Sequence, residues 1–211
     1  MHKLLNNYFS SIFTVEKMEK IPEARSIFKG DHADMLRDVE ISQVLVYERL
    51  KRLKKNKAPG FDNLDSDFLS KTAESISNPL TKIFLNSFEC GIVPADWKCA
   101  NVCSIFKKGK KTIPGNYRSV SLTSHVCKVF EGMVKDKIID HIDRHNLLNP
   151  SQHGFVKNKS CLTNLLETVS FLADCVDNHK NIDIVYLDFQ KAFDKVPHKR
   201  LLLKIKSLIL V

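Results

Sequence analysis

A chain of 211 residues that is 43% hydrophobic and 27% charged has the composition of a globular protein, which excludes wholesale disorder and collagen-like repeats. Its longest apolar runs fall far short of the about 18 residues that span a bilayer, and its polar start lacks the apolar stretch of a secretory signal. We therefore expect no membrane partner and an intracellular location, in the cytoplasm, the nucleus or both.

The formal net charge of +9 is concentrated in two stretches without acidic residues. The stretch 49–61 holds six basic residues, and the stretch 97–130 holds seven. A single basic run is usually a solvated face. Two acid-free stretches that border turns instead favour a polyanionic partner, and nucleic acid is the commonest one.

Three helices are predicted in the first half of the chain. The first covers 41–55 with Ser42 as its N-cap and ends before the breakers at 58–60, and the second covers 67–76. The third begins with Asn78 as N-cap and Pro79 in its first turn, and Gly91 lies just past its end.

The hydrophobic period then changes to that of a β-hairpin. Residues 99–106 and 117–122 are predicted as strands, joined by the lysine-rich loop 107–116. Amphipathic helices follow Ser124 and Ser160, and His141 and His145 fall on the first of them, where we expect a solvated face. The apolar, β-branched run 182–189 is predicted to be a buried strand that carries Asp188 near its end.

The six cysteines are scattered and form no C-x-x-C motif, which favours buried free thiols. A zinc set would have to combine Cys99, Cys103, His125 and Cys127, whose spacing matches no common finger. Trp97 is interpreted as structural.

Six short motifs stand in order along the chain: KAPG at 57–60, GIVP at 91–94 with Trp97 and Lys98, IFKKG at 105–109, NYR at 116–118, QHGF at 152–155 and YLDFQKAFDKVPH at 186–198. In these motifs and their spacing the chain closely resembles the reverse transcriptase of non-long-terminal-repeat (LINE-type) retrotransposons, of the jockey-like kind. The resemblance extends from about Tyr8 to Ser207.

This resemblance implies an α+β fold, namely the fingers and partial palm of a right-hand polymerase. Residues 1–40 would be an N-terminal extension, 41–181 a fingers-like region with the basic hairpin 99–122, and 182–211 the start of the palm. We expect the chain to be truncated before the second aspartate motif and the thumb.

The resemblance also implies a metal site. Nucleotidyl transfer uses two divalent ions about 3.5–4 Å apart, and hard Mg²⁺ or Mn²⁺ prefers carboxylate oxygens. Asp188 would be the first catalytic carboxylate, with the Phe189 carbonyl as a further metal ligand; capping of the turn 190–195 is the alternative for Asp188. Phe193 would abut the sugar of the incoming nucleotide, with core packing as its alternative.

The partners implied are an RNA template, a DNA primer and deoxynucleoside triphosphates, with no obligate protein partner. Arg118 would grip the triphosphate with its planar fork, and Lys107 or Lys108 would be the second cationic contact. Gln152 and Gly154 match a motif near the template, whereas His153 is equally well explained as an ordinary loop histidine.

The second carboxylate motif of the family, an aromatic-Ala-Asp-Asp turn, has no counterpart, because the sequence contains no Asp-Asp pair and no acidic residue after Asp194. We therefore expect that the chain alone does not hold the metal stably and does not polymerise. The alternatives are a non-catalytic nucleic-acid-binding remnant and, ranked lower, a zinc-structured interaction module.

Overall fold

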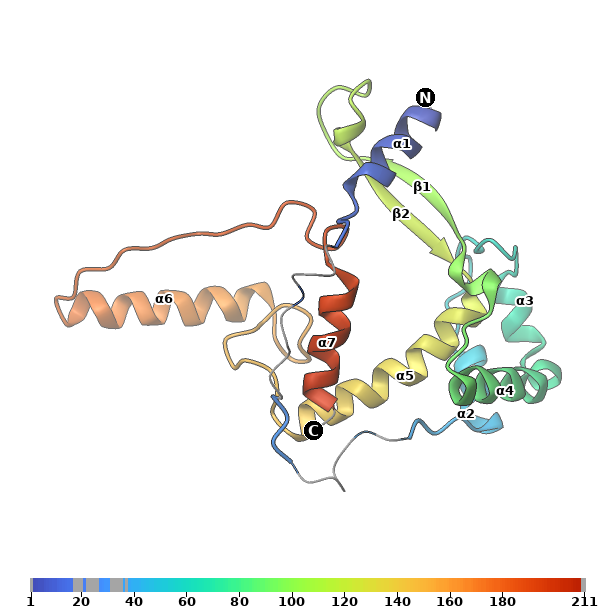
Figure 1. Ribbon diagram of the computed structural model, residues 1–211. Coiled ribbons are helices and arrows are strands. Elements are labelled where there is room, and N and C mark those ends of the chain that lie inside the picture. The colour runs from blue at the N-terminus through green and yellow to red at the C-terminus, as the bar shows by residue number, and fades with distance from the viewer. Residues whose placement is uncertain (1, 17–20, 22–26, 31–35, 37, 210–211) are drawn as a thin grey trace. The chain divides into compact units, whose positions relative to one another are not determined.

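The computed structural model describes residues 2–16, 21, 27–30, 36 and 38–209 (Figure 1). The described residues form helices and one two-stranded sheet, which confirms the mixed helix and sheet class. They divide into two compact units: unit 1 takes the described residues of 1–13 and 36–140, and unit 2 those of 14–35 and 141–211. Across the described ranges, no helix is both long and apolar enough to cross a membrane.

Among the described residues, four α-helices of unit 1 precede the sheet. They are α1 (His2–Ile12), α2 (Gln43–Lys51), α3 (Ser66–Lys71) and α4 (Ala73–Cys90). The predicted N-cap of α2 is confirmed, because Ser42 accepts a hydrogen bond from the Leu45 N–H at 3.4 Å. Gly91 ends α4 in the left-handed conformation (φ 65°), as predicted.

The predicted start of the third helix at Asn78 is wrong, because α4 runs without interruption from Ala73 through Pro79. Proline removes one backbone hydrogen bond from a helix interior and usually breaks or kinks the helix. Here the residues buried along one side of α4 lie both before and after the proline: Ala73, Ser77, Thr81, Phe84 and Ser87. Burial of this continuous face outweighs the local signal for a helix start.

An aromatic cluster lies at the centre of the core of unit 1. The ring of Phe84, which is fully buried, lies 5.6 Å from that of Trp97 and 5.2 Å from that of Phe130. The surrounding apolar residues come from α2, α3, α4 and α5, and include Val46, Leu50, Leu69, Val129 and Met133. Trp97, in the 3₁₀ turn η3 (Ala95–Lys98), is therefore structural, as predicted.

The predicted hairpin is confirmed. Strands β1 (Ala100–Phe106) and β2 (Tyr117–Thr123) pair antiparallel, with Ile105 opposite Arg118 and Phe106 opposite Tyr117. The short turn η4 (Pro114–Asn116) lies in the loop that joins them. At the other end β2 leads into α5 (His125–Arg144), whose first turn is capped because the Ser124 hydroxyl accepts hydrogen bonds from the Val126 and Cys127 N–H groups.

Unit 2 contains the last turn of α5, α6 (Cys161–Asp177) and α7 (His198–Ile209). The helix predicted after Ser160 is confirmed, and the structure shows that a capping box between Ser160 and Thr163 starts it. At the start of α7 the Glu16 carboxylate accepts hydrogen bonds from the backbone N–H groups of Lys199 (2.8 Å) and Arg200 (3.3 Å). An acidic side chain there stabilises the positive end of the helix.

The predicted solvated face at His141 and His145 is wrong. His141 is only 3% exposed, and its Nε2 lies 3.1 Å from the Leu208 carbonyl oxygen. The Phe28 ring packs 4.9 Å from both imidazoles, and the Phe28 N–H donates to the Ser207 carbonyl. These partners come from distant parts of the chain, so the spacing of the histidines gave no sign of their burial.

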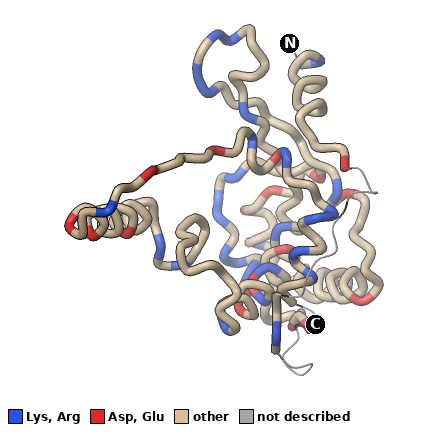
Figure 2. The backbone as a smooth tube through the Cα atoms, turned by 60° about the vertical axis from the view of Figure 1, so that its left-hand side comes forward, with Lys and Arg blue, Asp and Glu red and all other residues tan. Residues whose placement is uncertain are grey.

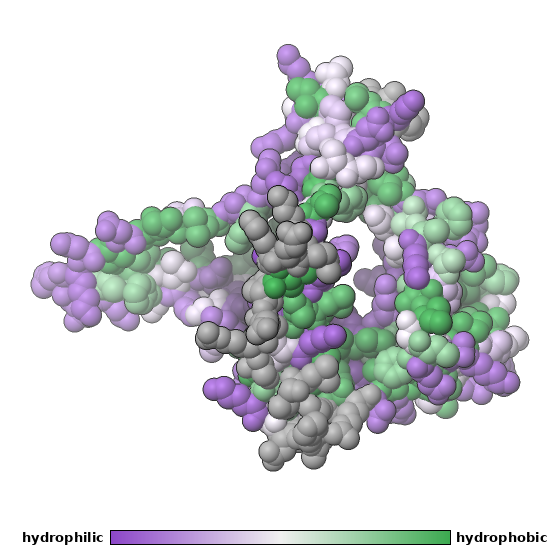
Figure 3. All heavy atoms as spheres, in the orientation of Figure 1, coloured by the Kyte–Doolittle hydropathy of each residue, from purple (hydrophilic) through white to green (hydrophobic). Residues whose placement is uncertain are grey.

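The predicted buried strand at 182–189 is also wrong. This segment has no regular secondary structure, and Tyr186 and Leu187 are more than four-fifths exposed. Among the described residues the only sheet is the β1–β2 pair, so no neighbouring strand satisfies this backbone. Apolar residues of α6 are exposed as well, and they appear green in Figure 3.

The cysteines are free, but the prediction of burial holds only for Cys127. Cys90, Cys99, Cys103 and Cys161 are exposed, and Cys175 is partly buried. The candidate zinc set thus mixes two exposed thiols with the buried Cys127 and His125. The described residues gather no three metal-ligating side chains in one place.

Substitution of Gly60 by alanine is expected to destabilise unit 1. A Cβ at this position would lie 2.5 Å from the Ser124 nitrogen and 2.6 Å from the Thr123 carbonyl carbon, both of them backbone atoms. Overpacking of this kind lowers the free energy of unfolding by about 1–3 kcal/mol. Denaturant unfolding measures the loss. The control is Gly154→Ala, whose Cβ meets nothing within 4 Å; equal stability of the two variants would contradict the packing.

The Cys127 thiol is expected to resist alkylation in the folded protein. Burial, followed by the nearby Glu131 carboxylate, raises the pKa of this thiol to about 12, so the reactive thiolate is almost absent at pH 8. Mass spectrometry after brief iodoacetamide treatment at pH 8 should find the exposed cysteines modified and Cys127 unmodified. In denaturant Cys127 should react as fast as the others. Rapid modification of Cys127 in native buffer would show that its burial is wrong.

Candidate functional site

The β1–β2 hairpin of unit 1 presents its basic residues to solvent. Arg118, Lys107, Lys108, Lys110 and Lys111 are all exposed. Because side chains alternate across a strand, Arg118 and its partner Ile105 share one face of the ribbon. The Lys107 N–H donates to the Asn116 carbonyl at 2.8 Å, which extends the same register by one residue and places Lys107 on the Arg118 face. Lys108 lies beyond this last ladder bond, in the bend.

Two side chains of the NYR motif hold the loop 107–116 in place. The Asn116 amide donates to the Lys110 carbonyl, and the Tyr117 hydroxyl donates to the Lys111 carbonyl, each at 2.9 Å. The Lys111 ammonium lies 5.8 Å from the centre of the Phe106 ring. The motif thus combines two residues that fix the loop with one, Arg118, that stays exposed. The sequence alone did not distinguish these roles.

The charge around the hairpin is of one sign. The stretch 97–130 contains no acidic residue, and Figure 2 shows Lys and Arg positions along the loop between the strands with no Asp or Glu among them. A surface of this kind attracts phosphate groups, and its Arg118 has the fork geometry that matches two phosphate oxygens.

In unit 2 the QHGF motif is fixed by its histidine. His153 is 8% exposed, and its Nδ1 lies 2.8 Å from the Thr163 hydroxyl while its Nε2 lies 2.7 Å from the Glu167 carboxylate. Both partners are on α6, so the imidazole ties the loop to this helix. His153 therefore anchors the motif structurally. The sequence alone did not show this role, because it depends on which side chains lie next to the imidazole in the folded protein.

The neighbours of His153 face solvent. Gln152 and Gly154 are exposed, and the Gln152 amide donates to the Gly154 carbonyl at 3.4 Å. The Phe155 ring meets the Phe193 ring edge-on, with the ring centres 5.8 Å apart. Phe193 is 76% exposed, which contradicts its alternative role in core packing. The structure thus brings together the QHGF motif and the Phe193 turn.

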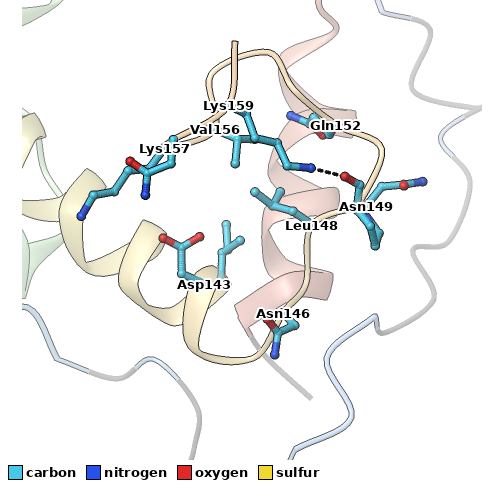
Figure 4. Close-up of a pocket in the computed structure, with 11 residues that line it drawn as sticks. Asp143, Asn146, Leu148, Asn149, Gln152, Val156, Lys157 and Lys159 are labelled. Carbon is cyan, nitrogen blue, oxygen red and sulfur yellow. Dashed lines mark hydrogen bonds between the residues drawn. The ribbon is translucent and has the colours of Figure 1, made fainter. Parts of the chain in front are cut away.

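A pocket of about 520 Å³ lies beside this motif (Figure 4). Its wall combines the end of α5 with the turns 148–152 and 156–159, and it includes Gln152. The Lys159 ammonium donates to the Pro150 carbonyl and joins the two turns. The Asp143 carboxylate and the apolar side chains of Leu148 and Val156 lie within this lining.

Asp188 and the Phe189 carbonyl are the metal-ligand candidates. Asp188 is exposed, as is Phe189, in the irregular segment before the turn 190–195. No cluster of three His, Cys, Asp or Glu side chains occurs in the part of the chain that the structure describes. Two divalent ions require several carboxylates. The donor set that the described residues place around Asp188 therefore does not fit such a metal pair.

The candidate residues divide between the two units. Arg118, Lys107 and Lys108 belong to unit 1, whereas unit 2 contains Gln152, Gly154, Asp188, Phe189 and Phe193.

Comparison with known proteins gives matches over most of the chain. The chain is 28% identical over 164 residues to a probable RNA-directed DNA polymerase from transposon BS of Drosophila melanogaster. The matched region covers 77% of this chain and 18% of that protein. The chain is 30% identical over 160 residues to the RNA-directed DNA polymerase from mobile element jockey of the same species, covering 75% and 18%.

A more distant relative is the Pol polyprotein from the type-1 retrotransposable element R2 of Popillia japonica, which is 26% identical over 68% of this chain and 19% of its own length. The chain thus spans less than a fifth of the length of these relatives. The model of the family described as reverse transcriptase (RNA-dependent DNA polymerase) matches residues 105–211, which is half of the chain. The match begins at the IFKKG motif of the exposed hairpin and includes Arg118, the QHGF motif and Asp188, so the chain belongs to the reverse transcriptase family.

Proposed function

We propose that this chain serves RNA-directed DNA synthesis, and that its basic hairpin binds the triphosphate of an incoming deoxynucleotide opposite an RNA template. The observation that carries the proposal is the hairpin register, which gives Arg118 and Lys107 a common exposed face in an acid-free stretch. The hairpin would act as part of the fingers of the polymerase, in the cytoplasm or the nucleus.

The same register favours Lys107 over Lys108 as the second triphosphate contact. In an antiparallel ribbon, diagonal neighbours on one face come within reach of long side chains, and Lys107 stands in that relation to Arg118. Lys108, in the bend beyond the last ladder bond, would contact template or primer phosphates without reading sequence.

The residues of unit 2 would supply the start of the palm. Asp188 would be the first metal-binding carboxylate, with the Phe189 carbonyl beside it, and Phe193 would abut the nucleotide sugar. Gln152 and Gly154 would face the template, and the contact between Phe155 and Phe193 supports a common site for these motifs. Members of the family generally depend on divalent metal, and within the described part of the chain no three metal-ligating side chains gather in one place.

A second candidate function is nucleic-acid binding without catalysis. It is favoured by the exposed basic residues of the hairpin, and by the finding that the described residues gather no three metal-ligating side chains. Both functions predict binding of nucleic acid that weakens with salt, because each phosphate contact releases counterions. They differ in whether the hairpin discriminates nucleoside triphosphates from other polyanions.

Replacement of Arg118 or Lys107 is expected to weaken triphosphate binding more than replacement of Lys108. Charge-assisted contacts contribute about 1.5–3 kcal/mol, so Arg118→Met and Lys107→Met should each raise the dissociation constant for a fluorescent deoxynucleoside triphosphate about tenfold or more. Titration by fluorescence anisotropy in the presence of a primer–template measures it. Lys108→Met also removes one positive charge, but Lys108 lies in the bend and not on the Arg118 face. This variant should therefore change the dissociation constant by less than about threefold. Equal effects at Lys107 and Lys108 would refute the register argument.

Primer extension by the 211-residue chain is expected to be undetectable with Mg²⁺ or Mn²⁺ and all four deoxynucleotides. The reason is that one carboxylate does not neutralise the charge that develops in phosphoryl transfer. A labelled primer on an RNA template, resolved on a denaturing gel, provides the measurement. Extension that disappears in Asp188→Asn would overturn this expectation and show that the site is complete.

A further inference from the structure

A groove between α2 and α5 in unit 1 has a separate set of basic side chains. It has a volume of about 330 Å³, and its charged lining residues are Arg49, Arg52, Lys128, Glu48 and Asp136. The two helices meet through core residues that include Val46, Leu50, Val129 and Met133, so the walls of the groove belong to packed elements. None of these charged residues belongs to the hairpin.

Gly132 makes room for an arginine in this groove. Lys128, Gly132 and Asp136 are spaced four residues apart and therefore share one face of α5. A Cβ at residue 132 would lie 3.0 Å from Nη1 of Arg49, so a side chain there would press on the guanidinium and shift it by a few tenths of an ångström. Its Nη2 donates to the Asp136 carboxylate at 2.8 Å, and the Arg49 side chain remains 32% exposed.

Stability alone does not account for this arrangement. A glycine inside a helix costs about 0.5–1 kcal/mol relative to alanine, and a partly exposed ion pair contributes about 0–1 kcal/mol. The two contributions are of similar size and opposite sign, so the fold gains little from holding Arg49 near Gly132. The arrangement does hold the Arg49 guanidinium in place through its Nη2. Among the described contacts only this nitrogen is engaged, so the other guanidinium nitrogens remain for a ligand.

The charges of the groove favour an anionic ligand. Glu48 is paired with Arg52 at 3.1 Å, and Asp136 is paired with Arg49 and lies 3.9 Å from Lys135. Each of these pairs joins one acid to one arginine, so the net positive charge of the lining comes from Lys128, which is exposed and has no ion pair among the described residues. The groove also borders the acid-free stretch 49–61, which continues its positive charge along the chain.

We infer that this groove binds a backbone phosphate of a nucleic-acid strand, with Arg49 forking to the phosphoryl oxygens and Lys128 supplying the second charge. A free di- or triphosphate presents the same oxygens, but the exposed lysines that follow α2 (Lys54, Lys55 and Lys57) fit a ligand that extends along the surface. The inference rests on the proposed function only in taking the extended polyanion to be nucleic acid.

A pair of variants distinguishes RNA binding by the groove from a general effect of positive charge. Lys128→Met removes a positive charge from the groove, whereas Lys82→Met removes one from the exposed side of α4, outside the groove lining. Fluorescence anisotropy with a labelled single-stranded RNA of about 20 nucleotides, at several salt concentrations, compares them. We expect Lys128→Met to weaken binding at least fivefold and Lys82→Met to weaken it less than twofold. Equal weakening by the two variants would overturn the inference.

Gly132→Ala and Arg49→Lys test the guanidinium itself, since both keep the net charge. Alanine favours the helix, so Gly132→Ala should unfold at the same or a higher temperature while binding RNA about threefold more weakly. Arg49→Lys should lose at least fivefold in affinity with its salt dependence retained. Wild-type affinity in both variants, with folding intact, would refute the site.

Three further outcomes distinguish failure of the groove inference from failure of the proposed function. If Arg118→Met weakens RNA binding but the groove variants do not, the groove inference fails and the proposed function stands. If the wild-type protein binds no RNA, both fail. If the groove variants alter binding of inorganic pyrophosphate but not of RNA, the ligand is a free polyphosphate and the assignment to a strand is wrong.

Discussion

The burial of Phe84 between Trp97 and Phe130 is the interaction on which unit 1 depends. This contact joins α4, η3 and α5, which lie on either side of the hairpin in the sequence, so both ends of the hairpin start from packed positions. The strands themselves bury little, and β1 is exposed along nearly its whole length. A two-stranded ribbon is marginally stable by itself. The hairpin that carries Arg118 is thus joined at both ends to a core that contains none of the candidate site residues.

Polar contacts have the corresponding role in unit 2. Glu16 caps α7, His141 contacts the Leu208 carbonyl, and His153 joins its loop to α6 through Thr163 and Glu167. Each contact satisfies backbone or side-chain groups that would be costly to leave unpaired. Many apolar side chains of α6 and of the segment 182–189 remain exposed (Figure 3), so hydrophobic burial contributes less here than in unit 1.

The basic residues have two kinds of surroundings, and this distinguishes their roles. On the hairpin the cations have no acidic neighbours in sequence, and they are ordered by the strand register and by the contacts of Asn116, Tyr117 and Phe106 with the loop. In the groove between α2 and α5 each acid is paired, and Arg49 is positioned by Asp136 above a glycine. The net charge of +9 therefore says less about where anions bind than the surroundings of each basic residue do.

The sequence by itself determined the N-cap Ser42, the helices that follow Ser124 and Ser160, the end of α4 at Gly91, the hairpin and the segregated charge, because these depend on a few neighbouring residues. The order of its motifs also indicated the family. Only the tertiary structure decided that α4 continues through Pro79, that His141 and His153 are buried, and that 182–189 is not a strand. Each of these outcomes depends on partners distant in the sequence: the buried face of α4, the Phe28 ring, the α6 side chains, and the neighbouring strands that a β-strand needs to satisfy its backbone.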